Sequence, residues 1–436
     1  MTLFGNILRR TMRKELCKKT AIVVIPAMLS FGLSGVYGIA DGYFLGNAIG
    51  DKALAAINIA YPLMALLQAL GTGLGMGGAV GYGLAHSTGN EKKANMFFSV
   101  SIISQVVMCL VLMPMIYFFS PQILSAFGAS GEILSMGIEY MRVISFGAIF
   151  QIMSSGLLPL TRNLGSYKMA SLAMVLGFCF NVVFDGLFVT VFGLGMWGGA
   201  VATLMGQAVA SFTCIIAIIK KKQKVSLTFE SEVLKNIIKT GISSFGLTLM
   251  PNIVLIFINK FLAVIGGDEA LTSYAIISYV IWIILLLVQG VGDGSQPLFT
   301  YYYAKGEEKT ALEVRNIALL YSVVLVVLFS SVIYLTRYQI PVFFGSSSDA
   351  IADIMPIFLV GLLFAPLTRV ITSYFFATEK NKLSYTLVYG ELVLLLIYLF
   401  VGASLFGLTG VWLSTPLSQI SIALISIVLA LKTKLK

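Results

Sequence analysis

Long apolar runs separated by short polar connections dominate the sequence. A bilayer core of ~30 Å is crossed by a helix of roughly 20 apolar residues, and helices fit a membrane interior because they pair all their backbone groups internally. Twelve runs meet this length, at residues 20–46, 54–84, 94–119, 132–158, 168–191, 197–219, 237–265, 270–303, 311–336, 350–377, 383–404 and 409–431. The pattern predicts an all-α integral membrane protein with twelve transmembrane helices.

The two halves of the chain repeat one another. Residues 50–94 align without gaps on residues 267–311, and this places the glycines 73, 75 and 77 on the glycines 290, 292 and 294. An even number of spans in each half gives both halves the same orientation, related by an axis along the membrane normal. We therefore expect two pseudo-symmetric six-helix lobes (1–219 and 236–436), a linker at 220–235 and a central cleft.

Composition and charge support the membrane assignment and add an orientation. Hydrophobic residues make up 58% of the chain and charged residues 11%, against about 25% charged in soluble domains. One set of connections, which includes both termini, holds 24 of the 29 Lys and Arg residues, whereas the opposite set holds only Lys52 and Arg337. The positive-inside bias then places both termini in the cytoplasm. The same clustering between apolar runs argues against nucleic acid as a partner.

Few residues suit enzymatic chemistry or a bound cofactor. The single histidine, His86, falls at a helix end, where we expect a surface residue, and the four cysteines show no paired spacing. No G-x-x-x-x-G-K-[ST] loop occurs, so the chain does not hydrolyse ATP by that motif. Two lobes around a cleft favour an alternating-access carrier, driven by an ion gradient or running downhill, over an enzyme.

Ionisable residues inside the apolar runs indicate where function lies, because they are costly in a membrane. Asp41 lies ~8 Å below the outer end of the first run, one helical turn beyond Tyr37. Asn181 and Asp185 are spaced i, i+4 in the fifth run, and Thr203 of the sixth run lies at a similar depth of ~9 Å. These oxygen-bearing side chains are suited to a hard cation or to a proton shared by two carboxylates.

The alternative is that each polar group only bonds a neighbouring helix. The second half does not repeat the acids, since position 41 maps onto Ile258 and the region of Asp185 maps near Leu399 and Phe400. An ionic site is therefore expected in the first lobe alone.

Weaker signals come from the second lobe and from a proline. Lys260, Asp293 and Arg369 lie within apolar runs and are candidates to line a substrate cleft; Asp293 is the strongest because it interrupts the glycine series. Pro26 removes a backbone hydrogen bond from the first helix. It is a candidate hinge, with a static kink as the alternative.

An ordered set of segments resembles the multidrug and toxic compound extrusion (MATE) transporters, most closely their DinF-like prokaryotic branch. The similarity extends over nearly the whole chain but rests on no single motif. It is carried by residues 41–46, 53–62, 181–185, 199–203, Gln296-Pro297, 301–303 and 410–416.

The resemblance implies a monomeric antiporter in the plasma membrane of a prokaryote. Such a protein needs no cofactor and no metal beyond a coupling Na⁺, and expels amphipathic, often cationic compounds in exchange for H⁺ or Na⁺. By position, Tyr37, Asp41, Asn181, Asp185 and Thr203 match the family's ion network and Pro26 its bent first helix, while Gln296 joins the cleft candidates.

Two other functions stay open. An exporter of one metabolite or peptide is supported by Asp293, which stands where the family more often has a neutral polar residue. A lipid-linked sugar flippase of the same superfamily would need a more cationic cavity than Lys260, Arg369 and Arg142 provide.

Overall fold

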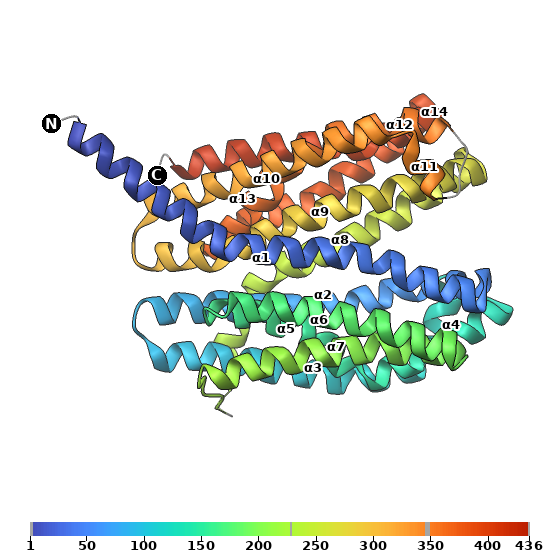
Figure 1. Cartoon of the computed structure of the whole chain (residues 1–436), viewed down its shortest axis with the longest axis horizontal. Coiled ribbons are helices and arrows are strands. Elements are labelled where there is room, and N and C mark those ends of the chain that lie inside the picture. The colour runs from blue at the N-terminus through green and yellow to red at the C-terminus, as the bar shows by residue number, and fades with distance from the viewer. Residues whose placement is uncertain (1–2, 227–228, 345–348, 435–436) are drawn as a thin grey trace. The chain divides into compact units, whose positions relative to one another are not determined.

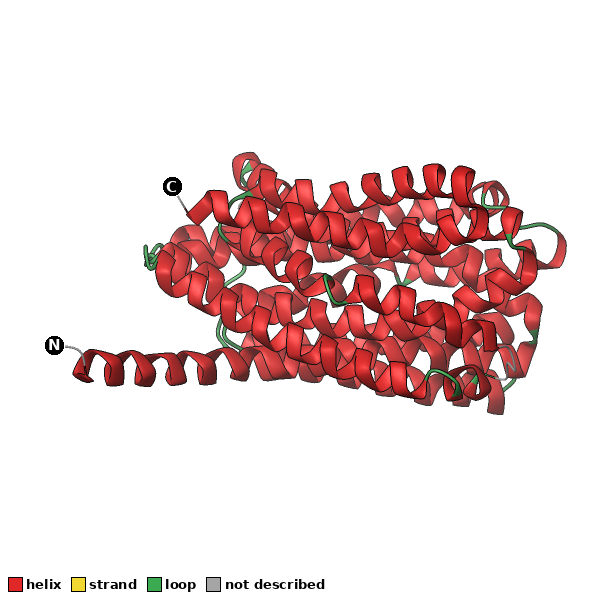
Figure 2. Cartoon of the chain, turned by 90° about the horizontal axis from the view of Figure 1, so that it is seen from above, coloured by secondary structure: helices red, strands yellow, loops and turns green. Residues whose placement is uncertain are grey.

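The computed structural model describes residues 3–226, 229–344 and 349–434, with side chains placed for 13–35, 44–50, 52–226, 229–344 and 349–433. These residues form helices joined by short loops, without a strand among them (Figures 1 and 2). The first half of the chain contains α1 (Leu3–Ile49), α2 (Asp51–Ser87), α3 (Glu91–Ala126), α4 (Gly131–Phe146), α5 (Ala148–Asn163), α6 (Tyr167–Asp185), the π-helical segment η1 (Gly186–Val191) and α7 (Gly195–Lys220). The second half contains α8 (Ser231–Ile265), α9 (Gly267–Ala304), α10 (Glu308–Thr336), α11 (Gln339–Phe343), α12 (Asp349–Leu362), α13 (Ala365–Ala377) and α14 (Asn381–Lys434).

The helices account for the predicted spans. Ten stretches of the described chain are long and apolar enough to cross a membrane, and α4 with α5, bent by 60°, passes the same test as a pair. The helix α14 is two spans in sequence, because Gly407 has a non-helical backbone (φ 57°, ψ −132°). Its halves fold back on one another. The backbones of Gly410 and Gly402 are in such close contact that a Cβ on Gly410 would collide with Gly402. Over the described residues this gives the twelve spans that the sequence predicts.

The internal repeat is visible in the backbone. Left-handed conformations recur at offsets of 217 or 214 residues, in the pairs Gly50 and Gly267, Gly89 and Gly306, Gly165 and Glu379, and Gly193 and Gly407. Each half also interrupts its fourth span, between α4 and α5 and between α12 and α13. The two halves therefore share one order of helices, turns and breaks, and the all-α, two-repeat fold class is confirmed.

The chain packs as two compact units that do not follow the sequence halves. Unit 1 comprises residues 1–32 and 254–436, and unit 2 comprises residues 33–253. The N-terminal part of α1 thus belongs with the second-half helices, and the beginning of α8 belongs with the first-half helices. The predicted division into lobes at a 220–235 linker remains a prediction.

The glycine series explains how each unit takes in a helix from the other half. In unit 2, a Cβ on Gly77 of α2 would lie 2.0 Å from the Ile237 carbonyl oxygen of α8, and one on Gly241 of α8 would lie 2.2 Å from that of Gly73. In unit 1, a Cβ on Gly290 of α9 would lie 2.7 Å from the Cα of Met28 in α1. Because side chains of any size would collide there, glycine permits this close helix packing in both units.

Candidate functional site

The end of α6 in unit 2 holds two of the predicted ion-site residues. Asp185 is 0% exposed and Asn181, one turn before it, is 2% exposed. Asn181 makes no hydrogen bond to any residue that the structure describes, through either its amide nitrogen or its oxygen. Burying an amide without a partner costs about 1–3 kcal/mol, and no described residue offsets that cost for Asn181.

The backbone changes form directly after Asp185. The π-helical segment η1 begins at Gly186, and π-helical turns within α-helices frequently occur at functional sites. The close approach of α6 to α7 fixes Asn181 as well, because a Cβ on Gly206 of α7 would lie 2.7 Å from the Asn181 Cβ. The local structure therefore holds Asn181 against α7.

Thr203 of α7 lies in the same unit and is 3% exposed. Its Oγ1 lies 3.4 Å from the hydroxyl of Tyr140, a buried residue of α4, and either oxygen can donate the hydrogen bond. Tyr140 was not among the residues singled out by sequence. The sequence signal that marks it is helical periodicity, since the buried face of α4 carries Gly137, Tyr140, Met141 and Ile144.

The C-terminal end of α1 packs on η1 and α7. Leu45 is buried, and its Cδ2 would lie 2.6 Å from a Cβ on Gly199 of α7; Phe44 would lie 3.6 Å from one on Gly186. Position 41 is one turn before Leu45 on α1, and Thr203 is one turn after Gly199 on α7. The side chains of Asp41 and Tyr37 themselves lie outside the described residues.

Buried polar side chains occur at these positions in the first half: Asn181, Asp185 and Thr203. The second half has apolar residues at the equivalent positions: Ile258 and Leu399 are buried in one hydrophobic cluster of unit 1. Among the described residues there is no group of three or more His, Cys, Asp or Glu side chains that would hold a metal. The donor set of carboxylate, amide and hydroxyl groups fits H⁺ or Na⁺ better than a transition metal.

The second-half candidates separate by burial into a buried group, on α9 and α13, and one exposed residue. Asp293 and Gln296 are buried on α9, where Gln289 Nε2 donates to Asp293 Oδ1 at 2.8 Å and Gln296 Nε2 donates to Thr300 Oγ1 at 2.8 Å. Arg369 of α13 is buried, with its Nη2 3.8 Å from Glu391 Oε1. Lys260 is exposed instead.

The packing of α9 on α13 brings together the helix segments that carry the buried candidates. A Cβ on Gly292 would lie 2.6 Å from Ser373 Oγ and 3.5 Å from the Arg369 carbonyl oxygen. The segment of α9 that carries Asp293 therefore packs on the segment of α13 that carries Arg369.

Pro26 lies where the N-terminal part of α1 crosses the glycines of α9. A Cβ on Gly294 would lie 3.0 Å from Ala27 Cβ, one residue from the proline. The helix continues through Pro26, and Ser30 Oγ donates to the Pro26 carbonyl oxygen at 2.9 Å. A bend of α1 at Pro26 would therefore alter the contact between α1 and α9.

Twelve spans in two repeats, with polar groups buried among the helices, define a polytopic membrane protein. The MatE family model matches this chain twice, at residues 26–187 and 240–401, once in each repeat. The chain belongs to the MatE family. Members of this family are secondary transporters, which confirms the prediction of a transporter in place of an enzyme.

Curated relatives and solved structures agree with this assignment. The multidrug export protein MepA of Staphylococcus aureus is 25% identical over 396 residues, covering 89% of this chain and 87% of MepA. MepA of Staphylococcus saprophyticus is 25% identical over 411 residues, covering 92% and 90%. The fold is similar to that of a crystallised Vibrio cholerae MATE transporter, VcmN, with a TM-score of 0.89, 18% identity and coverage of 97% and 98%.

A further solved structure has the same fold. A transporter of the MOP superfamily from Pyrococcus furiosus aligns with a TM-score of 0.86 and 22% identity over 94% of both chains. The similarity extends along nearly the whole of each protein.

Proposed function

We propose that this protein exports amphipathic, often cationic compounds across the plasma membrane of a prokaryote by exchanging them for H⁺ or Na⁺. The relatives named multidrug export proteins support the class of substrate. The distribution of Lys and Arg supports an orientation with both termini in the cytoplasm. The chain is proposed to act as a monomer, surrounded by membrane lipid.

The observation that carries the coupling proposal is the pair at the end of α6. Asp185 is fully buried, and the amide of Asn181 one turn away has no hydrogen-bond partner among the described residues. An ion bound there gains carboxylate and amide ligands that are already desolvated and held by packing. Thr203 supplies a hydroxyl group, and Asp41 and Tyr37 complete the proposed set from α1.

Coupling follows if the ion and the substrate favour different states of the transporter. A ligand shifts a conformational equilibrium only by its differential affinity for the two states. An ion that enters from outside and binds Asp185 and Asp41 would favour release of the exported compound. Pro26 is proposed as the point where α1 bends, with Asp293, Gln296, Arg369 and Lys260 as candidate substrate contacts.

The test is an efflux assay with ethidium, a fluorescent cation, in vesicles under a proton gradient or a sodium gradient imposed separately. Asp41→Asn and Asp185→Asn should each lower gradient-driven efflux by at least about tenfold, the effect of losing roughly 1.4 kcal/mol of coupling. The matched control is Asp353→Asn, which changes an exposed acid of α12 and should transport like the parent. Normal transport by both site variants under either gradient would refute the coupling site.

A narrower substrate range is the second candidate function. It is favoured by Asp293, a buried carboxylate that is held by Gln289 on α9. If the protein exports one endogenous compound, the parent should show no ethidium efflux. Asp293→Asn should then abolish transport of the endogenous compound. The flippase alternative is less well supported, because Arg369 already faces Glu391.

A further inference from the structure

A polar cavity of about 440 Å³ opens at the end of unit 2 where α2 turns into α3. It lies far along the helices from Asp185, at the end that carries the basic connections. The walls come from the α2–α3 turn, the end of α5 and the segment that leaves α7, and consist of Tyr82, His86, Glu91, Asn95, Leu164, Lys221, Lys222, Gln223 and Lys224.

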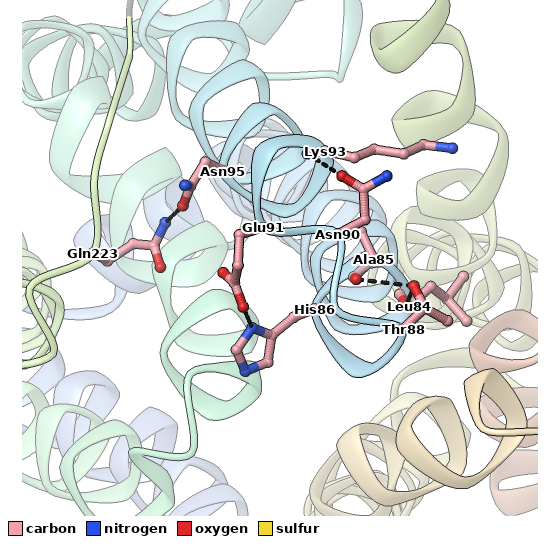
Figure 3. Close-up of polar contacts among 9 residues, drawn as sticks. All are labelled: Leu84, Ala85, His86, Thr88, Asn90, Glu91, Lys93, Asn95 and Gln223. Atoms are coloured by element: carbon pink, nitrogen blue, oxygen red, sulfur yellow. Dashed lines mark hydrogen bonds and ion pairs between the residues drawn. The ribbon is translucent and has the colours of Figure 1, made fainter.

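One wall is built around the only histidine of the chain. His86 Nδ1 lies 2.8 Å from Glu91 Oε1 (Figure 3). The imidazole ring also stacks on Tyr82, with ring centroids 5.4 Å apart. Figure 3 shows the second ring nitrogen of His86 on the side away from Glu91. The carboxylate and the tyrosine thus orient the imidazole and leave one nitrogen for a ligand.

The opposite wall is the segment after α7, which is tied to α3. Gln223 Nε2 donates to Asn95 Oδ1 at 2.5 Å, as Figure 3 shows, and the Ser226 backbone N–H donates to Ser99 Oγ at 2.9 Å. Lys222 has a left-handed backbone with φ of 52°. The segment is therefore held at a defined place beside the cavity by side chains of α3.

The charges on this wall are positive and uncompensated. Lys221, Lys222 and Lys224 are exposed and form no salt bridge with any residue that the structure describes. Glu91 is the only acid in the lining, and it is already engaged with His86. Three ammonium groups and one imidazole against one carboxylate leave a net positive cavity.

We infer that this cavity binds a phosphate-bearing anion. Several ammonium donors around one polar cavity favour a multiply charged oxyanion, because phosphate accepts many charge-assisted hydrogen bonds at once. The side-chain amide of Asn95 and the second ring nitrogen of His86 add further polar groups to the lysines. A run of lysines that served only to orient the chain in the membrane would need neither a cavity nor a fixed wall.

Two sources supply such a group at this end of the helices. One is the headgroup of an anionic phospholipid, since lysines near a membrane surface are attracted to anionic lipid. The other is a small soluble phosphate compound. The inference does not depend on the coupling site, because none of the residues that line this cavity belongs to that site.

The experiment measures the melting temperature of the purified full-length protein in two arms. In the first, nanodiscs of phosphatidylcholine receive increasing fractions of phosphatidylglycerol; in the second, glycerol 3-phosphate is titrated into pure phosphatidylcholine nanodiscs. The cavity variant is Lys221→Gln/Lys222→Gln/Lys224→Gln. The control is Lys92→Gln/Lys93→Gln/Lys235→Gln, which removes the same charge from exposed lysines outside the cavity.

We expect a saturable rise in melting temperature in the parent and the control, in the lipid arm, the soluble arm or both. The cavity variant should require on the order of tenfold more anion for the same rise. The arm that responds identifies the source. Equal responses in the cavity variant and the control, or no response in either arm, would overturn the inference.

If the triple variant does not fold, a single substitution that should strengthen anion binding provides the test. Glu91→Gln removes the only negative charge from the lining, so it should lower the anion concentration needed for half the rise by about threefold or more. Unchanged or weaker anion binding by Glu91→Gln would contradict a binding site in this cavity.

Discussion

The contact between α6 and α7 beside Asn181 gives a prediction whose size follows from the structure. Two glycines lie near the proposed ion site and differ in the space around them. A Cβ on Gly206 would lie 2.6 Å from the Gly177 carbonyl oxygen and 2.7 Å from Asn181 Cβ, whereas one on Gly186 would meet only Phe44, at 3.6 Å. Gly206→Ala therefore forces the helices apart, and Gly186→Ala does not.

The cost of Gly206→Ala is an overpacking term. Carbon atoms pack best at ~3.5–4.0 Å, so α6 and α7 must separate by roughly 1 Å. Overpacking of this kind costs about 1–3 kcal/mol. Both substitutions gain the same helix propensity from alanine, about 0.5–1 kcal/mol, so the difference between the two variants isolates the packing term. At ~2 °C per kcal/mol for a large chain, Gly206→Ala should melt about 2–6 °C below Gly186→Ala.

The assay is the melting temperature of both purified variants in one detergent, followed by ethidium efflux in vesicles. The added Cβ of Gly206→Ala would displace Asn181. Ethidium efflux by Gly206→Ala should therefore fall below that by Gly186→Ala at equal protein amounts. Equal melting temperatures for the two variants would refute the close packing. A lower melting temperature with unchanged efflux would separate the packing from the proposed role of Asn181.

Three further predictions concern other parts of the fold. Gly165 and Glu379 occupy equivalent left-handed positions, so Gly165→Ala should lower and Glu379→Gly should raise stability by about 1 kcal/mol each, measured as shifts in melting temperature. Tyr140→Phe removes the hydroxyl group beside Thr203; it should cost about 0.5–1.5 kcal/mol and raise the concentration of coupling ion needed for half-maximal efflux. Burial lowers the pKa of the Lys380 ammonium below its ordinary value of 10.5, so the folded chain releases this proton at a lower pH than the unfolded chain. Stability attributable to Lys380 should therefore increase as the pH rises toward 10.5, and Lys380→Gln should flatten that increase in a series of melts from about pH 9 upward.

The positions of the helices follow from the sequence because hydropathy reports the bilayer directly. The helix ends follow less well, because helices continue past the apolar core into water. The run at 94–119 becomes α3 at Glu91–Ala126, and its start is set by Asn90, whose side chain accepts a hydrogen bond from the Lys93 N–H. That cap is a local signal, separate from hydrophobicity.

The candidate site was predictable where charge and helical spacing coincide. Asn181 and Asp185 are found buried on one helix, and Thr203 is buried on the next. Tyr140 was missed because an uncharged residue inside an apolar run gives no signal of its own until the buried face of its helix is known. Lys260, singled out for its charge alone, lies exposed.

The exchange of helices between the two units was not predictable from one sequence. The repeat shows that α1 corresponds to α8 and α2 to α9, but it does not say which pairs touch. The close approaches of Gly290 to Met28 and of Gly77 to Ile237 depend on the path of each backbone. Glycines at these positions are compatible with tight packing against any neighbouring helix.

The most direct test of the central claim is ion release from the purified protein when substrate binds. Ethidium is added to the protein in weakly buffered detergent solution, with a pH-sensitive dye and a sodium electrode reporting H⁺ and Na⁺. We expect the parent to release one of these ions as ethidium saturates, and Asp185→Asn to bind ethidium without that release. Equal ion release by Asp185→Asn and the parent, or saturable ethidium binding by the parent with no release of either ion, would contradict the claim that the buried carboxylate on α6 links ion to substrate.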